Sequence, residues 1–321
     1  MKILQVADRP GWAVDRLSKP LTGDNVDICY FEVHDRFLDT GYTEKGVSKP
    51  YSLELANNYD VVHFHRWKAA ELVVNKLNVG IKTVLSLHNE HDFKEADLSL
   101  YDVIICPTNY IFDNVEHPRK FLVPYGIDLK KYQYDFKEHE DNVGFIGRVI
   151  PHKRFEKIHY ACLTAGIQLI ATGYIEDPKL FGKYKGHALG KGVRDPIFTS
   201  MLPEVQMPDF YHKLKFLVSV SEERHETGPL PVLEAMASGV PVISTQVGWA
   251  RDWCRHGENI WFVGDKTVND QKKLGKLLYD LLQRKDIQIR LRNNGMMVVS
   301  KFGLDRYKKS LMQIYEDITN C

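Results

Sequence analysis

Short runs of Val, Ile and Leu alternate with helical patterns along most of the chain. In its N-terminal part these runs contain few polar positions, which is typical of parallel strands that are covered on both faces. The expected strands are Lys2–Ala7, Asp27–Phe31, Val61–His65, Thr83–His88, Val103–Pro107 and Lys120–Val123, and a helix is expected at Ala69–Leu77. This alternation predicts a doubly wound α/β sheet.

A second alternation follows a polar, charge-dense stretch at Leu129–Asn142, which we interpret as a linker. Strands are expected at Val143–Arg148, Gln168–Thr172, Phe216–Ser219, Val240–Ser244 and Ile260–Val263, and helices at Phe155–Ala165, Asp209–Leu214, Leu230–Ser238 and Gln271–Arg284. The sequence therefore predicts two α/β domains, at residues 1–135 and 136–300, and a C-terminal helix within residues 301–321. The apolar stripe of that helix would cover either the first domain or the second.

Composition narrows the class of protein. The chain has 321 residues, enough for two domains of ordinary size, and its 44% hydrophobic and 26% charged residues predict a packed soluble protein. The apolar run after Met1 is too short for a signal peptide, and no run approaches the roughly 18 apolar residues of a membrane helix. Five scattered cysteines fit reduced thiols better than disulfides or a zinc site. We therefore expect a cytoplasmic protein without a transmembrane segment, for which peripheral membrane contact stays open.

Charge is divided unevenly between the two predicted domains. Residues 1–135 carry 16 Lys and Arg against 20 Asp and Glu, and the remaining residues carry 27 against 22, so the net charges are −4 and +5. The basic second part suits an anionic ligand. The acidic first part argues against a nucleic-acid or anionic-lipid acceptor, because both favour basic surfaces.

Candidate chemistry is densest between Glu226 and Val242. Of two carboxylates eight positions apart, Glu226 is expected in a Gly/Pro turn and Glu234 in the first turn of the short apolar helix that follows. Backbone N–H groups at a helix N-terminus attract an anion, and carboxylates accept hydrogen bonds from hydroxyls. An anion beside a polyol is what a nucleotide sugar presents.

This stretch, Glu226-Thr-Gly-Pro-Leu-Pro-Val-Leu-Glu-Ala-Met-Ala-Ser-Gly-Val-Pro-Val242, resembles the signature of the retaining glycosyltransferases of the GT4 family, which have the GT-B fold. The matching residues are Glu226, Leu230, Pro231, Glu234, Ala235, Met236, Ala237, Gly239, Pro241 and Val242. Thr227, Gly228 and Pro229 replace the usual Gly-Phe-Gly. Since Pro229 lacks an N–H, a backbone donor of the family would have to come from Gly228 or Leu230.

The resemblance implies a fold and a separate binding role for each of the two domains. It implies two Rossmann-like, doubly wound domains facing across a cleft, with the acceptor bound by the first and the nucleotide-sugar donor by the second. It also implies that the C-terminal helix crosses back to the first domain.

A second motif, at Gly144–Arg154, is similar to the family's Gly-Arg-x-x-x-x-Lys element, in which Arg and Lys hold the donor diphosphate. Here those residues are Arg148 and Lys153, although Arg154 next to Lys153 leaves a one-place shift open. Cations fixed there would stabilise the departing diphosphate more than the ground state. By the same resemblance, Glu226 faces the sugar and phosphate, and Glu234 holds the ribose hydroxyls.

Polar residues also lie at the carboxyl ends of the expected strands of the first domain. His88 matches the family's His at this strand end, which contacts the donor sugar. His63 and His65 end the preceding strand, and they either line an acceptor pocket or are structural. Trp12 either stacks on a sugar or belongs to the core, and Gly11 is the single Gly of a loop that is Gly-rich in the family.

These considerations predict three sets of site residues. The catalytic set is His88, Arg148, Lys153 and Glu226; the donor-binding set is Gly11, Arg148, Lys153, Gly173, Glu226, Thr227, Gly228, Pro229, Leu230, Pro231 and Glu234; the acceptor-binding set is Trp12, His63, His65 and Asn89. No metal site and no cofactor are expected.

The predicted reaction is retaining, metal-independent hexosyl or pentosyl transfer from a UDP- or GDP-sugar to a hydroxyl of a glycan, lipid or small molecule, with nucleic acid as a less favoured acceptor. A front-face mechanism is expected, in which the leaving phosphate helps to deprotonate the acceptor. Two alternatives stay open. One is a nucleotide-sugar hydrolase or phosphorylase on the same fold, and the other is a non-catalytic module that binds nucleotide sugars or associates with nucleic acid. An oxidoreductase is disfavoured, because no Gly-x-Gly-x-x-Gly opens a helix.

Overall fold

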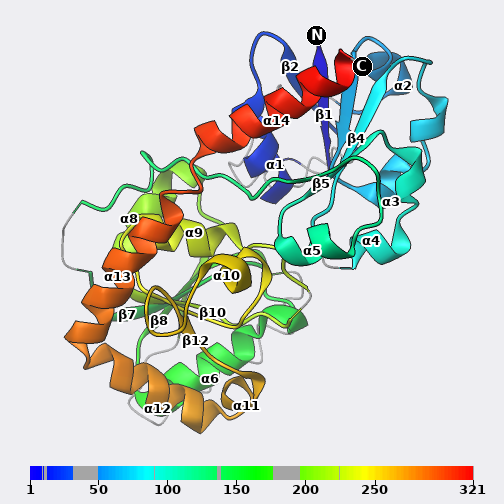
Figure 1. Ribbon diagram of the computed structural model, residues 1–321. Helices are drawn as coiled ribbons and strands as arrows, with labels where there is room; N and C mark the ends of the chain where they lie inside the picture. Colours follow the sequence, from blue (N-terminus) through cyan, green and yellow to red (C-terminus); the bar gives the residue numbers. More distant parts are fainter. Residues whose placement is uncertain are drawn as a thin grey trace. The chain divides into compact units, whose positions relative to one another are not determined.

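The computed structural model describes residues 1–8, 10, 13–31, 50–89, 91–135, 139–175, 196–223 and 225–320. The chain divides into two compact units (Figure 1). The N-terminal unit comprises Met1–Ile127 together with Phe302–Cys321, and the C-terminal unit comprises Asp128–Lys301. The last helix of the chain therefore belongs to the N-terminal unit, and residues 128–135 belong to the C-terminal unit.

In the N-terminal unit the described strands form one parallel six-stranded sheet in the order β2-β1-β3-β4-β5-β6. The strands are β1 Ile3–Ala7, β2 Val26–Tyr30, β3 Val61–Phe64, β4 Lys82–Ser86, β5 Val103–Cys106 and β6 Lys120–Leu122. The strand order changes direction between β1 and β3, so this is the switch point at which open α/β sheets bind ligands, outside the carboxyl ends of the strands.

Different helices cover the two faces of this sheet. The helices are α1 Ala13–Ser18, α2 Leu53–Ala56, α3 Trp67–Ala70, α4 Asp92–Glu95, α5 Asn109–Asn114 and α14 Leu304–Thr319. One face packs against α2, α3 and α5, and the other packs against the apolar stripe of α14 (Figure 1). The helix predicted at Ala69–Leu77 is wrong as a single element, because α3 ends at Ala70 and a separate 3-10 turn spans Val74–Lys76. The β-branched pair Val73 and Val74 disfavours a continuous helix there.

The C-terminal unit contains a second parallel sheet, for which the described residues give six strands in the order β12-β11-β10-β7-β8-β9. The strands are β7 Asn142–Ile146, β8 Leu169–Gly173, β9 Ile197–Ser200, β10 Leu214–Ser219, β11 Val242–Ser244 and β12 Trp261–Phe262. The helices are α6 Phe155–Ala165, α8 Met207–His212, α9 Leu230–Ala237, α10 Gly248–Trp253, α11 Asp265–Val268, α12 Gln271–Leu282 and α13 Lys285–Val299. The predicted organisation of two parallel α/β sheets is confirmed. The sequence pattern did not identify β9 or α13.

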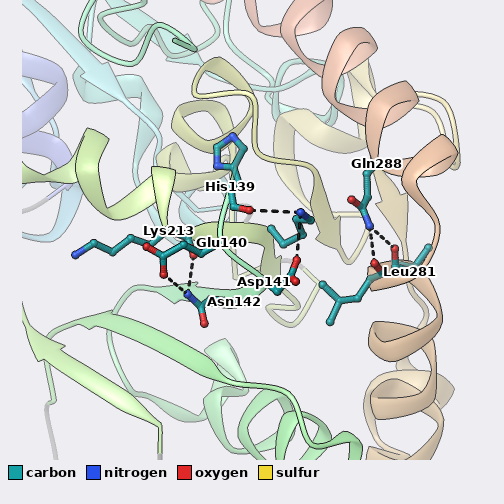
Figure 2. Close-up of polar contacts among 9 residues, drawn as sticks. His139, Glu140, Asp141, Asn142, Lys213, Leu281 and Gln288 are labelled. Atoms are coloured by element: carbon teal, nitrogen blue, oxygen red, sulfur yellow. Dashed lines mark hydrogen bonds and ion pairs between the residues drawn. The ribbon is translucent and has the colours of Figure 1, made fainter. Parts of the chain in front are cut away.

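The segment predicted as a linker is packed onto the C-terminal unit. Tyr132 and Tyr134 are buried, and the Tyr134 hydroxyl accepts a hydrogen bond from Arg292 Nη1 at 3.0 Å. Near the start of β7, the Lys215 ammonium donates to the His139 carbonyl at 3.4 Å and lies 3.2 Å from a carboxylate oxygen of Asp141 (Figure 2). The aromatic residues therefore override the polar composition, because burying them favours a fixed position over a solvated linker.

Further hydrogen bonds hold the start of β7 and the turn between α12 and α13. Asn142 Nδ2 donates to Glu140 Oε2 at 2.9 Å and to the Lys213 carbonyl at 3.0 Å, and Gln288 of α13 donates to the Leu281 carbonyl at 2.9 Å (Figure 2).

Among the described helices, none is both long and apolar enough to cross a membrane.

Candidate functional site

The charged residues predicted in the second half of the chain meet at the switch point of the C-terminal sheet. Read from β9, the strand order is 3-2-1-4-5-6, and it changes direction between β7 and β10. The loop that follows β7 carries Arg148 and Lys153, and the loop that follows β10 carries Glu226. Parallel strands place both loops at the same carboxyl edge, where α/β sheets bind ligands.

Two glycines keep the ends of β7 and β8 close together. Gly173 has φ +149°, and a Cβ added to it would lie 1.9 Å from the Gly147 carbonyl oxygen. The Gly147 N–H donates to the Thr172 carbonyl at 3.0 Å. A side chain at position 173 would therefore force the two strand ends apart, which accounts for Gly at this predicted donor-binding position.

Lys153 and Glu226 form an ion pair that is largely shielded from water. Their side chains are 18% and 11% exposed. His152 Nε2 lies 4.0 Å from the same Glu226 oxygen. Burial, and secondarily the charge of Lys153, lower the pKa of His152. The site therefore presents one cation and one carboxylate side by side, with a histidine whose neutral form is favoured.

The neighbouring cations have different surroundings. Arg154 Nη1 pairs with Asp265 at 2.6 Å and its Nε lies 3.6 Å from Glu222. Lys153, rather than Arg154, is therefore the residue beside Glu226, and Glu222 has a structural contact. Arg148 is half-buried in the same loop.

The turn before α9 is held by backbone contacts. The Thr227 carbonyl accepts a hydrogen bond from the Trp249 N–H at 2.9 Å. A Cβ on Gly248 would lie 2.2 Å from that carbonyl oxygen, so only glycine allows α10 to approach so closely. Thr227, Gly228, Pro229 and Leu230 are buried, and Pro231 is half-buried.

Glu234 points into the C-terminal unit. It is 1% exposed, and the Tyr211 hydroxyl of α8 donates to its Oε2 at 2.7 Å. The same hydroxyl lies 3.2 Å from the Pro231 carbonyl. The structure thus separates the two carboxylates of the motif: Glu226 faces a cation, and Glu234 is held inside by a tyrosine.

A row of polar residues lies at the switch point of the N-terminal sheet, on the face that α14 covers. Successive side chains of a strand point to opposite faces, so residues two positions apart lie on the same face. Gln5 follows Ile3, His63 follows Val61, and Ser86 follows Val84 at this spacing, and the three apolar residues pack on the face that α14 covers. Gln5 is the register partner of His63 across β1 and β3. The row therefore crosses three adjacent strands.

Hydrogen bonds join this row to α14 and to His88. We call it the histidine network; its members are Tyr125, His88, His65, Gln5, Tyr315, His63 and Ser86. The joined atoms and their distances are Tyr125 OH and His88 Nδ1, 2.7 Å; His88 Nε2 and His65 Nδ1, 3.0 Å; His65 Nε2 and Gln5 Oε1, 2.7 Å; Gln5 Nε2 and Tyr315 OH, 2.8 Å; Tyr315 OH and His63 Nδ1, 2.5 Å; His63 Nε2 and Ser86 Oγ, 2.8 Å. His63 and His65 are 0% and 5% exposed.

Burial sets the protonation of the network. It lowers the pKa of His63 to about 3 and that of His88 to about 4, and it lowers the pKa of His65 well below the ordinary range. The three imidazoles are therefore neutral near pH 7, and each has one N–H and one acceptor nitrogen.

The backbone after β4 is fixed by Asp92. Its Oδ2 accepts from the backbone N–H groups of His88 and Asn89 at 3.0 Å and 2.9 Å, and its Oδ1 accepts from Trp67 Nε1 at 3.0 Å. Asn89 is exposed and His88 is half-buried. Among the predicted N-terminal site residues that the structure describes, these two are thus accessible, whereas His63 and His65 lie in the interior.

Two predicted residues, Gly11 and Trp12, lie outside the described residues. Across the described ranges, no group of three or more His, Cys, Asp or Glu is arranged to hold a metal ion. Sequence reasoning missed Tyr211 and Gln5, interpreted Tyr125 as structural, and placed Tyr315 only in the apolar stripe of the last helix. For Gln5 a signal existed, because a polar residue at a core-facing position of a buried strand usually has a buried partner.

Comparison with known proteins gives a consistent picture. A family model described as glycosyl transferases group 1 matches residues 127–296. An uncharacterized glycosyltransferase of Methanocaldococcus jannaschii is 25% identical over 280 residues, which cover 81% of this chain and 76% of that protein. A GDP-mannose-dependent α-mannosyltransferase of Mycolicibacterium smegmatis is 34% identical over 118 residues, which cover 36% of this chain and 29% of that protein.

The fold as a whole resembles a solved structure. HepE of Anabaena, crystallised in complex with UDP-glucose, matches with a TM-score of 0.79 and 14% identity over 99% of this chain and 100% of that chain. At that identity the likeness concerns the fold, and it confirms the predicted GT-B class.

Proposed function

The chain belongs to the group 1 glycosyl transferase family, and from that premise we propose that it is a retaining, metal-independent glycosyltransferase. It would move a sugar from a nucleotide-diphosphate sugar to an acceptor hydroxyl, with the donor on the C-terminal unit and the acceptor on the N-terminal unit. The observation that carries this proposal is the Lys153–Glu226 pair at the switch point of the C-terminal sheet. A phosphate of the donor can pair with the Lys153 ammonium in place of Glu226, and sugar hydroxyls can donate hydrogen bonds to the Glu226 carboxylate.

Donor binding follows from the chemistry of this edge. Arg148 and Lys153 would hold the diphosphate, Arg148 through a two-pronged guanidinium contact and Lys153 as a point charge. The N-terminus of α9 near Leu230 would add backbone N–H groups, and Gly173 would contribute by keeping the ends of β7 and β8 close together. HepE binds UDP-glucose and the mycobacterial relative uses GDP-mannose, which supports a UDP- or GDP-sugar here.

Glu234 would orient the ribose. A carboxylate has about four acceptor positions, so the bond from Tyr211 fixes its direction and leaves capacity for ribose hydroxyls. Because Glu234 is 1% exposed, the nucleoside would have to reach into the interior between α8 and α9.

The chemical step would use the charges already present. As the bond between the anomeric carbon and the phosphate oxygen breaks, negative charge grows on the diphosphate, and Arg148 and Lys153 stabilise it. The acceptor oxygen bonds to the anomeric carbon on the same face, and its proton passes to the departing phosphate. Glu226 and His88 would position the sugar, and Asn89 would contact the acceptor.

Ligand-dependent stability tests the donor site. UDP, GDP, ADP and their sugar conjugates are added to the full chain, and the melting temperature is measured; a ligand at 100 times its Kd stabilises by about 2.7 kcal/mol. One nucleotide family should stabilise the protein, and Arg148→Ala and Lys153→Ala should remove the effect. Lys276→Ala, in an exposed pair with Asp280 on α12, is the matched control and should retain it.

Product analysis tests the reaction. Transfer should require an acceptor, continue in the presence of EDTA, and give a product with the anomeric configuration of the donor. An absence of stabilisation by every nucleotide would refute the donor site. An inverted product, or release of sugar to water alone, would refute retaining transfer.

A further inference from the structure

The histidine network has a direction that follows from the Gln5 amide. The Gln5 Oε1 atom faces His65 Nε2 at 2.7 Å, and the Gln5 Nε2 atom faces Tyr315 OH at 2.8 Å. An amide oxygen only accepts, so His65 must donate from Nε2. The Ser18 hydroxyl oxygen, 3.2 Å from the same nitrogen, is then a second acceptor of that proton. The proton of a neutral imidazole cannot be on both nitrogens, and His65 Nδ1 is therefore an acceptor.

The same reasoning extends to His88. Because His65 Nδ1 accepts, the atom 3.0 Å away, His88 Nε2, must donate. His88 Nδ1 is then the acceptor, and the Tyr125 hydroxyl donates to it at 2.7 Å. The tautomer of His88 is thus decided by a glutamine two bonds away in the network.

At the other end, α14 completes the network. Tyr315 OH accepts from Gln5, so its own proton goes to His63 Nδ1 at 2.5 Å. His63 then donates from Nε2 to Ser86 Oγ at 2.8 Å. Tyr315 is 1% exposed, so water cannot readily replace its hydroxyl. Without that hydroxyl, the Gln5 amide would lose the partner that fixes its orientation.

We propose that Tyr315 and Gln5 are positioning residues that hold His88 as its Nε2–H tautomer, with Nδ1 as an acceptor. This inference rests on the proposed function, since it deepens the role of His88 at the sugar. A substrate hydroxyl that replaces Tyr125 at Nδ1 must then donate its hydrogen. The docking of the last helix of the chain thereby determines the hydrogen-bonding polarity of a residue in the site.

The tautomers are measured directly by NMR of the full chain with 15N-labelled histidine. Long-range proton–nitrogen correlations distinguish the two tautomers of each neutral ring, and His63→Gln, His65→Gln and His88→Gln assign the signals. The expected result is an Nε2–H tautomer for all three rings. A His88 ring protonated at Nδ1 would overturn the inference.

Two variants separate the ends of the network. Tyr315→Phe keeps the ring and removes the hydroxyl, and His88 is expected to change from one tautomer to a mixture of both. Tyr125→Phe removes the bond at the opposite end, and His88 should remain Nε2–H because His65 still requires it. An unchanged His88 signal in Tyr315→Phe would overturn the role of Tyr315.

A matched control lies on the same helix. Tyr307 is also a buried tyrosine of α14 (3% exposed) and is not a member of the histidine network. Tyr307→Phe should leave the His88 signals as they are. If it changed them as Tyr315→Phe does, packing of α14 rather than the Tyr315 hydroxyl would be responsible, and the inference would be refuted.

Kinetics connect the tautomer to the reaction. Tyr315→Phe should lower kcat about three- to tenfold, the effect of one lost hydrogen bond, while the Kd of the nucleotide stays the same. A protein without any transferase activity would contradict the proposed function, yet the NMR result would stand. A normal kcat with mixed tautomers would contradict the inference alone.

Discussion

The carboxyl ends of the two sheets carry polar clusters of different electrical character. In the C-terminal unit, the cluster pairs full charges, Lys153 with Glu226, and its side chains are 18% and 11% exposed. In the N-terminal unit, the histidine network shares protons among neutral groups, and His63 and His65 are 0% and 5% exposed. Both clusters lie at the switch point of a parallel sheet.

Burial explains the difference. An ionised group in the interior requires a partner of opposite charge, or its pKa shifts until it is neutral. The imidazoles of the network have only neutral hydrogen-bond partners within it, and burial lowers their pKa values, at His88 against the opposing effect of the Asp92 carboxylate. In the C-terminal cluster, Lys153 and Glu226 are paired with each other as groups of opposite charge. The same topological position therefore suits an anionic ligand in one unit and the precise orientation of a neutral ring in the other.

The largest expected effect comes from removing the cation of the charged cluster. Lys153→Ala should lower kcat/KM about 10²- to 10³-fold, because a fixed charge that meets developing negative charge contributes that much. Transfer of labelled sugar measures the change. Lys153→Arg, which keeps the charge, should retain more activity, and Lys276→Ala should behave as the unmodified protein. Near-normal activity in Lys153→Ala would remove the charged cluster from the mechanism.

The second effect concerns the backbone that shapes the charged cluster. Gly173→Ala should destabilise the protein by about 2–4 kcal/mol, because φ +149° and a 1.9 Å approach to the Gly147 oxygen force the strand ends to move. Urea unfolding measures the change in the free energy of unfolding. Gly166→Ala is the control: its φ is +70° but nothing lies within 4 Å of the added Cβ. It should cost only about 1 kcal/mol, and equal costs would contradict the steric argument.

The third effect concerns the neutral cluster and its response to pH. The folded-state pKa values of His63 and His88, about 3 and about 4, lie below the value of about 6.5 expected in the unfolded chain. The unfolded chain therefore binds more protons below that value. The contribution of these two neutral imidazoles to the free energy of unfolding is therefore complete above pH 6.5, and it is lost as the pH falls toward 4.

Measuring the free energy of unfolding between about pH 7.5 and about pH 4.5, the range in which histidines of the unfolded chain take up protons, checks this prediction. His139 in the C-terminal unit, whose pKa burial lowers to about 4, contributes to the same slope. The His63→Gln variant isolates the network, since it should give a shallower dependence of the unfolding free energy on pH. An identical slope would mean that His63 is protonated in the folded protein.

The smallest effect concerns a neutral partner within the charged unit. Tyr211→Phe removes the hydroxyl that donates to Glu234 at 2.7 Å, so the carboxylate loses its fixed orientation. The Kd of the nucleotide should rise about three- to tenfold, as measured by titration calorimetry. Tyr279→Phe, on the exposed face of α12 and itself 52% exposed, should leave the Kd unchanged. If both variants bind equally well, Glu234 does not hold the ribose.

Much of the fold was accessible from the sequence, because parallel strands buried on both faces leave continuous apolar runs. The helix at Phe155–Ala165 was predicted with the bounds that it has in the structure, and most strands shifted by one or two residues. The edge strand β9 was missed because it is half-exposed and has no continuous apolar core. The motif at Glu226 and Glu234 indicated the chemistry of the C-terminal switch point.

The sequence by itself determined most of the strands and the polar residues that end them, since both follow from local periodicity. Only the tertiary structure decided which partner each polar residue has. Lys153 rather than Arg154 lies beside Glu226, Tyr211 holds Glu234, and Tyr315 meets Gln5 across 310 positions of sequence. Such partners depend on strand order and helix docking, and a local pattern contains no information on either.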